Sequence, residues 1–142
     1  MQVQFYEEIE DQLLKFAVII SKYQNKWVFC KHKLRDTFEI PGGHREENEN
    51  ILETAKRELY EETGAIDFKI KPICVYSVIG KNRVNTGEEL YGMLYYADIY
   101  SFEENLHSEM EKIVLFNELP NLWTYPEIQP KLIEYYINLG NK

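Results

Sequence analysis

Several features that define whole classes of protein are scarce in this sequence of 142 residues. Its two cysteines, Cys30 and Cys74, lack Cys-x-x-Cys spacing, so we expect structural thiols and neither a disulfide nor a zinc site. No segment approaches the ~18 uninterrupted apolar residues of a membrane-spanning helix. The N-terminal residues are too acidic and polar for a signal peptide. These absences predict a cytoplasmic protein that does not bind membranes.

Positive charge is also in short supply. The chain has 16 Lys and Arg against 24 Asp and Glu, a net charge of −8. Proteins that bind DNA or RNA polymers use clustered Lys and Arg to contact the phosphates, so a nucleic-acid polymer is excluded as the expected partner. Residues 46–62 hold seven acidic and two basic side chains, so most of the net charge lies in one short stretch.

What is present is typical of one globular domain. Hydrophobic residues make up 44% and charged residues 28% of the chain, both close to globular averages. The length suits a single domain over residues 1–142. Residue patterns predict strands at 16–21, 26–32, 38–40, 67–79, 90–100 and 113–116, and helices near 50–64 and 126–138. We therefore expect an α/β domain with a mixed sheet and two main helices.

Two prolines and four glycines refine these boundaries. Pro72 places its part of the 67–79 strand at a sheet edge or a bend, because proline cannot donate to a central ladder. Residues 41–43, Pro-Gly-Gly, are expected to form a turn before the first helix. Gly64 and Gly140 are the expected stops of the two helices.

The first helix has a well-marked start. Asn50 can cap it, and Glu53 follows three residues later, as in a capping box. At 100° per residue, one sector of the helix is apolar and is predicted to face the core, formed by Ile51, Leu52, Ala55 and Leu59.

Glu58, Glu61 and Glu62 gather near the end of this helix, at the edge of its apolar face. Like charges three or four residues apart cost ~0.2–0.5 kcal/mol per pair, and carboxylates in the last turn oppose the helix dipole. The alternative is a Glu-rich helix whose side chains simply spread into water. Arg57, four residues before Glu61, offsets part of this charge, but one arginine does not neutralise three glutamates, so a further positive partner is implied. Hard oxygen donors without His or Cys suit Mg²⁺ or Mn²⁺.

The spacing around these glutamates resembles the Nudix box. Gly43, five residues, Glu49, seven residues and then residues 57–65, Arg-Glu-Leu-Tyr-Glu-Glu-Thr-Gly-Ala, match its fixed positions, with Ala65 small for the last aliphatic place. The preceding residues 38–42 are similar to the family's approach to the box. The resemblance implies the Nudix α/β/α sandwich and a metal-dependent hydrolase of nucleoside diphosphates linked to another group.

The resemblance also implies roles for individual residues. Glu58 and Glu62 correspond to the principal magnesium ligands, Glu61 to a further ligand or the carboxylate that activates water, and the Gly42 carbonyl to a backbone ligand. Arg57 corresponds to the residue that orients the glutamates, and Glu49 to an auxiliary acid. The choice of general base between Glu58 and Glu61 stays open.

Within the family, the chain looks most like the MutT-type enzymes, which convert a (d)NTP, including 8-oxo-dGTP, to a nucleoside monophosphate and pyrophosphate. Lys31 and Arg35 are candidates to meet the phosphates, and Glu109 or Glu111 to supply a further metal ligand or base. Trp123 and Tyr125 either stack on a base or close the core.

Several alternatives remain open at this stage. The MutT-type Asn that reads guanine is missing before the last helix, where Pro126 stands. ADP-ribose or a nucleotide sugar is the alternative substrate, and a non-catalytic nucleotide-binding module is the alternative of another class. The chain is expected to be a monomer or a homodimer.

Overall fold

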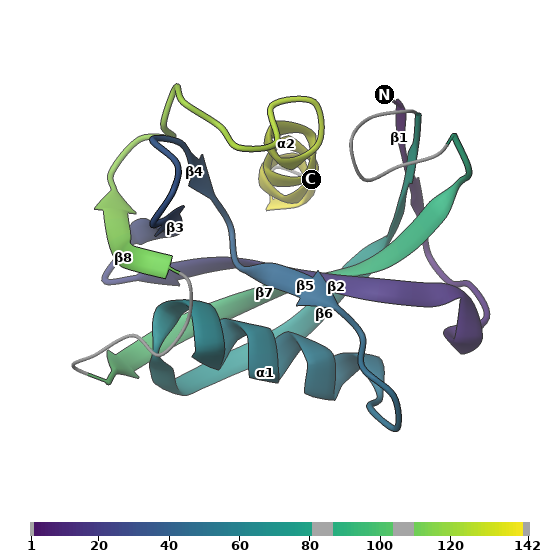
Figure 1. Cartoon of the computed structure of the whole chain (residues 1–142), viewed down its shortest axis with the longest axis horizontal. Helices are drawn as coiled ribbons and strands as arrows, with labels where there is room; N and C mark the ends of the chain where they lie inside the picture. Colours follow the sequence, from purple (N-terminus) through teal and green to yellow (C-terminus); the bar gives the residue numbers. More distant parts are fainter. Residues whose placement is uncertain (1, 81–86, 104–109, 141–142) are drawn as a thin grey trace.

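The computed structural model describes residues 2–80, 87–103 and 110–140, with backbone alone at 110–112. Its sheet lies between two helices, with α2 (Gln129–Gly140) above it and α1 (Ile51–Thr63) below it in Figure 1. The predicted α/β sandwich is therefore confirmed. Neither helix of the described chain is long and apolar enough to cross a membrane. The strands are β1 (Gln2–Tyr6), β2 (Leu14–Tyr23), β3 (Lys26–His32), β4 (Phe38–Glu39), β5 (Gly42–His44), β6 (Ala65–Ile79), β7 (Leu90–Phe102) and β8 (Met110–Phe116), and a short 3-10 helix spans Asp11–Leu13.

The centre of the sheet is β2, which pairs with different neighbours along its length. The strand order is β1-β6-β7-β2-β3-β4, and β5 and β8 add to β2 and β3. The β2–β7 pair is parallel and the other pairs are antiparallel. On its other side, β2 pairs with β5 over residues 16–18 and with β3 only at Lys22 and Tyr23. The segment from β4 to β5 therefore runs between these two pairings and reaches the middle of the sheet.

Two cores form on the two faces of the sheet. Successive side chains of a strand point to opposite faces, and Ile19 and Ile20 are both fully buried, one on each side. Ile20 packs in the cluster that includes Leu132 and Ile133 of α2. Ile19 packs in the cluster that includes Ala55 and Leu59 of α1. These cores fix both helices against the strands that carry the site.

The face of α1 differs in part from the predicted one. Leu52 is 38% exposed, so its predicted place in the core is wrong. Thr54 and Thr63 are buried in its stead, because their hydroxyls find hydrogen-bond acceptors. The Thr54 hydroxyl donates to Glu49 at 2.7 Å and the Thr63 hydroxyl to the Leu59 carbonyl at 2.6 Å. A satisfied hydroxyl can be buried on a helix face at little cost.

The remaining strand predictions are largely confirmed. The hairpin of β2 and β3 turns at Gln24 and Asn25, both with positive φ. Within the described residues, β6 has no partner on its outer side at Pro72, because β1 pairs with residues 75–79, and a register shift follows Pro72. Residues 42–44 form a short strand where a turn was predicted, and α2 includes Gly140, the expected stop. β1 was not predicted.

Candidate active site

Helix α1 begins and ends where its sequence signals predict. The Asn50 side chain accepts from the Glu53 N–H at 2.8 Å, and the Glu53 carboxylate accepts from the Asn50 N–H at 3.4 Å. Gly64 follows the helix with φ 76°, a left-handed conformation that glycine adopts without strain. These limits place the last two turns of the helix, with their glutamates, next to β5.

Arg57 connects most of the carboxylates near the end of α1. Its Nε and Nη2 donate to the two oxygens of Glu49, at 2.6 and 3.1 Å, and Nη2 also donates to the His44 carbonyl at 3.0 Å. Its Nη1 donates to Glu58 at 2.7 Å and to Glu61 at 3.3 Å. The planar guanidinium therefore holds three side chains and the end of β5 in one arrangement.

Glu49 serves this network as an anchor. Besides Arg57, it accepts from the Thr54 hydroxyl and from the Glu46 N–H at 3.1 Å. Hydrogen bonds from Arg57, above all, and from Thr54 lower the pKa of Glu49 to about 2. The Glu49 carboxylate is thus ionised and held in place. Its hydrogen bonds direct it toward Arg57, which it positions.

Gly42 faces the last turn of α1. The Pro41 carbonyl accepts from the Ile19 N–H, and hydrogen-bonded positions alternate along an antiparallel pair, so Gly42, opposite Val18, lies at a position that does not bond to β2. Its N–H donates to the Glu62 carboxylate at 2.7 Å. In an extended strand the N–H and C=O of one residue point the same way, which directs the Gly42 carbonyl toward the side of Glu62.

Gly43 allows the helix and β5 to lie very close together. A Cβ atom at this position would collide with the Glu58 carboxylate. No other residue has room here unless Glu58 moves. The two glycines thus have separate tasks, since Gly42 binds Glu62 and Gly43 makes space for Glu58.

The electrostatics of this cluster favour a cation. Burial, followed by the nearby charges of Glu58, Glu39 and Glu61, raises the pKa of Glu62 to about 8 despite the hydrogen bond from Gly42. Burial also raises the pKa of Glu58, against the opposing effect of Arg57. These carboxylates carry more negative charge than Arg57 offsets. Their hard oxygen donors are those that Mg²⁺ and Mn²⁺ prefer, so the residues present fit a divalent metal.

The predicted convergence of the three glutamates is incomplete in this arrangement. Glu58 and Glu61 are turned toward Arg57, and Glu62 toward Gly42. Among the described residues, no three His, Cys, Asp or Glu side chains are gathered closely enough to hold a metal ion. Binding a metal would require at least one of these carboxylates to turn.

A cavity of about 260 Å³ lies beside this cluster, between the sheet and α2. Gly42, Gly43 and His44 form the part of its wall next to the glutamates. The rest of the lining is Phe16, Val18, Glu39, Ile40, Tyr76, Val78, Leu90, Tyr125, Ile128, Gln129 and Leu132, which is mostly apolar and aromatic. Such a cavity, with few polar groups, is typical of a small-molecule site.

The predicted substrate residues have different positions relative to this cavity. Arg35 lies 3.6 Å from Glu39, which lines the cavity, whereas Lys31 lies in β3 opposite Phe38 and is not part of the lining. Trp123 packs edge-to-face on Phe29, with ring centroids 5.3 Å apart, so it closes the core. Tyr125, the other aromatic residue considered, lines the cavity.

Glu109 falls outside the described residues, and Glu111, which was expected in a loop, lies in β8 with its side chain not described. Their roles therefore stay predictions.

The sequence interpretation missed Glu39 and Gln129. Both are buried polar residues of the cavity wall. Gln129 shares the 3.6-residue period of Leu132 and Ile133, which would have placed it on the buried face of the last helix. Glu39 stands between two apolar residues of a predicted strand, and only its tertiary surroundings show that it is buried.

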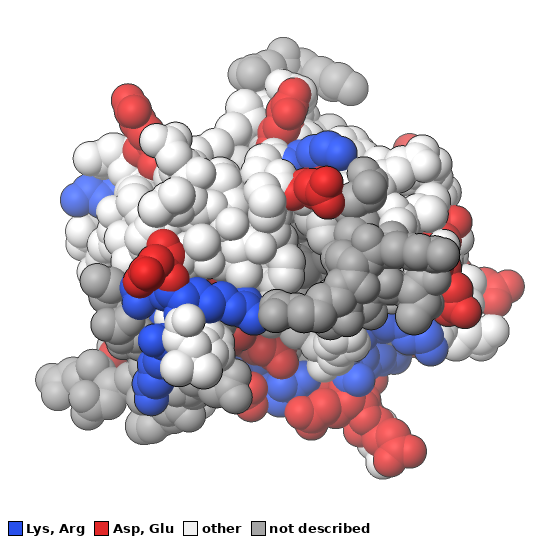
Figure 2. Space-filling model, turned by 45° about the horizontal axis from the view of Figure 1, so that its top comes forward, with Lys and Arg blue, Asp and Glu red and all other residues white. Residues whose placement is uncertain are grey.

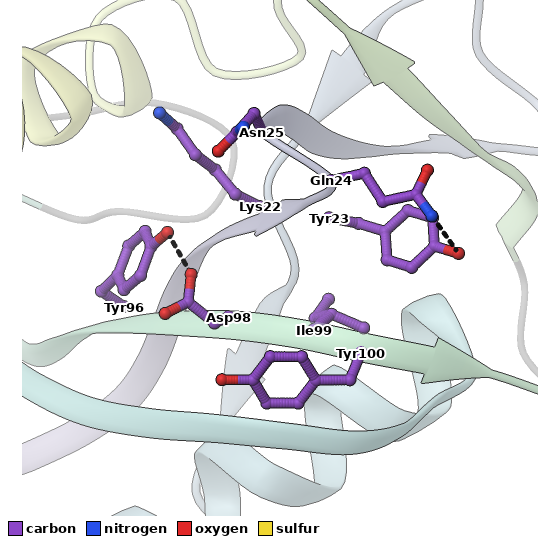
Figure 3. A pocket seen from close by; sticks show the side chains of 8 residues that line it. All are labelled: Lys22, Tyr23, Gln24, Asn25, Tyr96, Asp98, Ile99 and Tyr100. Atoms are coloured by element: carbon purple, nitrogen blue, oxygen red, sulfur yellow. Dashed lines mark hydrogen bonds between the residues drawn. The ribbon is translucent and has the colours of Figure 1, made fainter.

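A second hollow of about 350 Å³ lies at the other end of β2 (Figure 3). Side chains of the β2–β3 turn and of the end of β7 line it, and the Tyr96 hydroxyl donates to Asp98 at 2.7 Å. None of its lining residues belongs to the cluster of residues 42–62. Acidic and basic side chains are intermixed on the face shown in Figure 2, without a single-sign charge over its described part.

Comparisons with known proteins point to one family. A model of the NUDIX domain matches residues 13–136. The Bacillus subtilis (strain 168) protein YtkD, provisionally named an 8-oxo-dGTP diphosphatase, is 34% identical over 121 residues, 84% of this chain and 73% of that protein.

Two solved structures share the fold over most of the chain. A variant of the Bacillus subtilis pyrophosphohydrolase BsRppH has a TM-score of 0.77 and 27% identity, over 97% of this chain and 91% of that one. A MutT NUDIX hydrolase of Burkholderia pseudomallei has a TM-score of 0.66 and 21% identity, over 84% and 94%. The chain therefore belongs to the Nudix family of hydrolases.

Proposed function

We propose that this enzyme is a magnesium-dependent nucleoside triphosphate pyrophosphohydrolase, which converts a (d)NTP to a nucleoside monophosphate and pyrophosphate. The observation that carries the proposal is that Gly42 and Gly43 line the cavity and also contact Glu62 and Glu58 of the carboxylate cluster. With the base and the ribose in the cavity, the phosphates lie at the end of α1. The relative YtkD is provisionally named an 8-oxo-dGTP diphosphatase, and this name supports a nucleoside triphosphate as the substrate.

Four residues are suited to hold the metal: Glu58, Glu61 and Glu62 through their carboxylates, and Gly42 through its carbonyl. When bound there, Mg²⁺ would neutralise diphosphate charge and lower the pKa of a coordinated water. Mn²⁺ suits the same oxygen donors. Arg57 and Glu49 do not hold the metal themselves. They position the carboxylates that would hold it.

The general base is Glu61 or Glu58. Glu61 is exposed and held by a single bond to Arg57, of 3.3 Å, so it can turn to accept the proton of an attacking water. The Glu58 side chain is only 12% exposed and accepts from Arg57 at 2.7 Å, which makes it less free to turn. The longer hydrogen bond of Glu61 to Arg57 therefore favours Glu61 as the general base.

The test is an assay of (d)NTPs, 8-oxo-dGTP and ADP-ribose with and without Mg²⁺, with the products separated. We expect Mg²⁺-dependent release of pyrophosphate from triphosphates. The variants Glu61→Gln and Glu62→Gln should lower kcat by at least about 100-fold, because each removes a carboxylate of the reaction site. Glu134→Gln, an exposed glutamate of α2, is the matched control and should keep full activity.

Each other outcome contradicts part of the proposal. Full activity of both Glu61→Gln and Glu62→Gln would refute the site assignment. Hydrolysis of ADP-ribose alone would favour a nucleotide-sugar substrate, and inactivity of the native enzyme on every substrate would favour a non-catalytic binding module.

A further inference from the structure

Arg45 follows β5 directly and stands at the start of the acidic loop, residues 45–49, that leads to α1. In the sequence it is a positive charge next to Glu46, Glu47 and Glu49, a pattern typical of a solvated loop. In the structure its side chain is only 20% exposed. Burial of a guanidinium costs free energy unless its N–H groups find acceptors, so what Arg45 bonds to is informative.

The acceptors of Arg45 come from two segments of the chain. Its Nη1 donates to the Asp11 and Leu14 carbonyls, at 2.9 and 3.4 Å, and its Nη2 donates to the Asp11 carboxylate at 2.9 Å. Its main-chain N–H donates to the Lys15 carbonyl at 2.8 Å. Its Nε bonds within the acidic loop, to the Glu49 carbonyl at 2.7 Å. Arg45 therefore ties the acidic loop to the short 3-10 helix and to the start of β2.

Glu49 is consequently held by two arginines. Arg45 bonds to its main-chain carbonyl, and Arg57 bonds to both oxygens of its carboxylate. Because the main chain of Glu49 sets where its carboxylate can reach, movement of this main chain would break both bonds to Arg57. The Nη1 of Arg57 in turn bonds to Glu58 and Glu61. A continuous series of hydrogen bonds thus connects Arg45 with the carboxylates of the site.

The bonds of Arg45 differ in how much they can contribute. The Asp11 side chain is 68% exposed, and an ion pair so accessible to water contributes little. The bond to the Glu49 carbonyl is partly buried and holds the residue that anchors Arg57. Because the two bonds use different nitrogens of the guanidinium, the ion pair can be removed while the Glu49 bond is kept.

We propose that Arg45 is a positioning residue of the active site, which acts through Glu49 and Arg57 and touches neither the substrate nor the metal. Its planar guanidinium bonds to the loop and to the 3-10 helix at the same time, which the single ammonium of a lysine cannot do in this geometry. Groups that orient metal ligands from outside typically change activity or metal affinity by roughly 10- to 100-fold. The inference rests on the proposed Mg²⁺-dependent hydrolysis at the carboxylates of α1.

The kinetic test uses Arg45→Met, which keeps the length of the side chain and removes every side-chain donor. With Mg²⁺ and a nucleoside triphosphate, we expect kcat to fall about tenfold and KM to change by less than about twofold, because Arg45 does not line the cavity. Asp11→Asn is the control, since it removes only the charge of the exposed ion pair, and should keep the native kcat. Arg45→Lys keeps a charge beside Asp11 without the planar fork, and its kcat should fall as in Arg45→Met.

A second background separates positioning from a general weakening of the fold. In an Arg57→Lys enzyme, Arg45→Met should lower kcat by less than about twofold further, because its effect passes through Arg57. A change that only weakens the fold lowers kcat by the same factor whether Arg57 is present or not.

A third readout needs neither metal nor substrate. The Arg57 Nε–H bonds to Glu49 at 2.6 Å, so its exchange with water, followed by NMR in EDTA, should be slow. Arg57→Lys assigns this signal by its absence. We expect Arg45→Met to accelerate the exchange at least about fivefold and Asp11→Asn to leave it unchanged.

Native kcat in Arg45→Met, an equal loss in Asp11→Asn, or the same factor of loss in the Arg57→Lys background would each overturn the inference. Unchanged exchange of the Arg57 Nε–H in Arg45→Met would overturn it as well. If the native enzyme hydrolyses no triphosphate, the proposed function fails, and the exchange measurement still decides whether Arg45 positions Arg57.

Discussion

At the scale of single residues, Arg57 contacts more of the site than any one glutamate does. Its guanidinium bonds to Glu49, Glu58 and Glu61 and to the His44 carbonyl at once. Lysine keeps the charge but has no planar fork, so Arg57→Lys cannot hold these groups together. We predict a fall in kcat of about 10- to 100-fold with an unchanged circular dichroism spectrum. The neighbouring exposed Lys56→Ala is the control, and equal losses in both variants would contradict the positioning role.

Glu62 gives the metal-free protein a pH-dependent stability. The ordinary pKa of a glutamate is 4.5, and burial is the chief cause that raises the pKa of Glu62 to about 8 in the folded protein. Protonated Glu62 thus favours the folded state, and this contribution is complete below about pH 4.5 and is lost as the pH rises to about 8. Glu62→Gln mimics the protonated form at every pH.

In EDTA, we therefore predict that Glu62→Gln increases the free energy of unfolding at pH 8 by roughly 1–3 kcal/mol and has little effect near pH 4.5. Urea denaturation at the two pH values measures this difference. A variant less stable than the native protein at pH 8 would contradict the raised pKa.

The residues of the site differ in how far sequence alone can locate them. Arg57, Glu58, Glu61 and Glu62 lie within two turns of one helix, so their proximity follows from helical geometry. Glu39 and Gln129 are 90 positions apart in the chain and line the same cavity only because α2 packs next to β4, where the Gln129 side chain accepts from the Ile40 N–H. No local pattern encodes that contact, and for this reason the cavity wall was missed while the cluster on α1 was found.

At the scale of elements, the close approach of β5 to α1 decides the geometry of the site. A Cβ atom at Gly43 would collide with the carboxylate of Glu58, whereas one at Gly140 would meet nothing within 4 Å. We predict that Gly43→Ala displaces Glu58 and lowers kcat by at least about tenfold. Gly140→Ala makes the same change at the end of α2 and should leave kcat unchanged. An active Gly43→Ala enzyme would show that the contact between β5 and α1 is not needed.

The elements themselves were predictable to different degrees for physical reasons. The capping box and Gly64 define α1 locally, so its limits followed from the sequence. The strand β1 is only five residues long and is stabilised by pairing with the distant β6, a contact that its own composition does not reveal. The same holds for β5, whose Gly-Gly sequence is typical of a turn but which pairs with β2.

At the scale of the whole molecule, the two cores hold α1 and α2 on opposite faces of one sheet, and the site spans elements from both halves of the chain. The metal ligands that we propose come from α1 and from the β4–β5 segment, so the proposed metal site would form only in the folded chain. A ligand that binds only the folded state raises its stability by mass action. Mg²⁺ binding should therefore be visible in global unfolding.

We predict that Mg²⁺ at about 100 times its dissociation constant stabilises the native protein at pH 8 by about 2.7 kcal/mol, which raises Tm by roughly 5–10 °C. Differential scanning calorimetry in Mg²⁺ and in NaCl of equal ionic strength measures the effect and corrects for screening. Glu62→Gln should lose most of the shift because it removes one charged ligand next to Gly42, whereas Glu134→Gln should keep it. An equal rise of Tm in NaCl, or the full rise in Glu62→Gln, would show that Mg²⁺ does not bind at the end of α1.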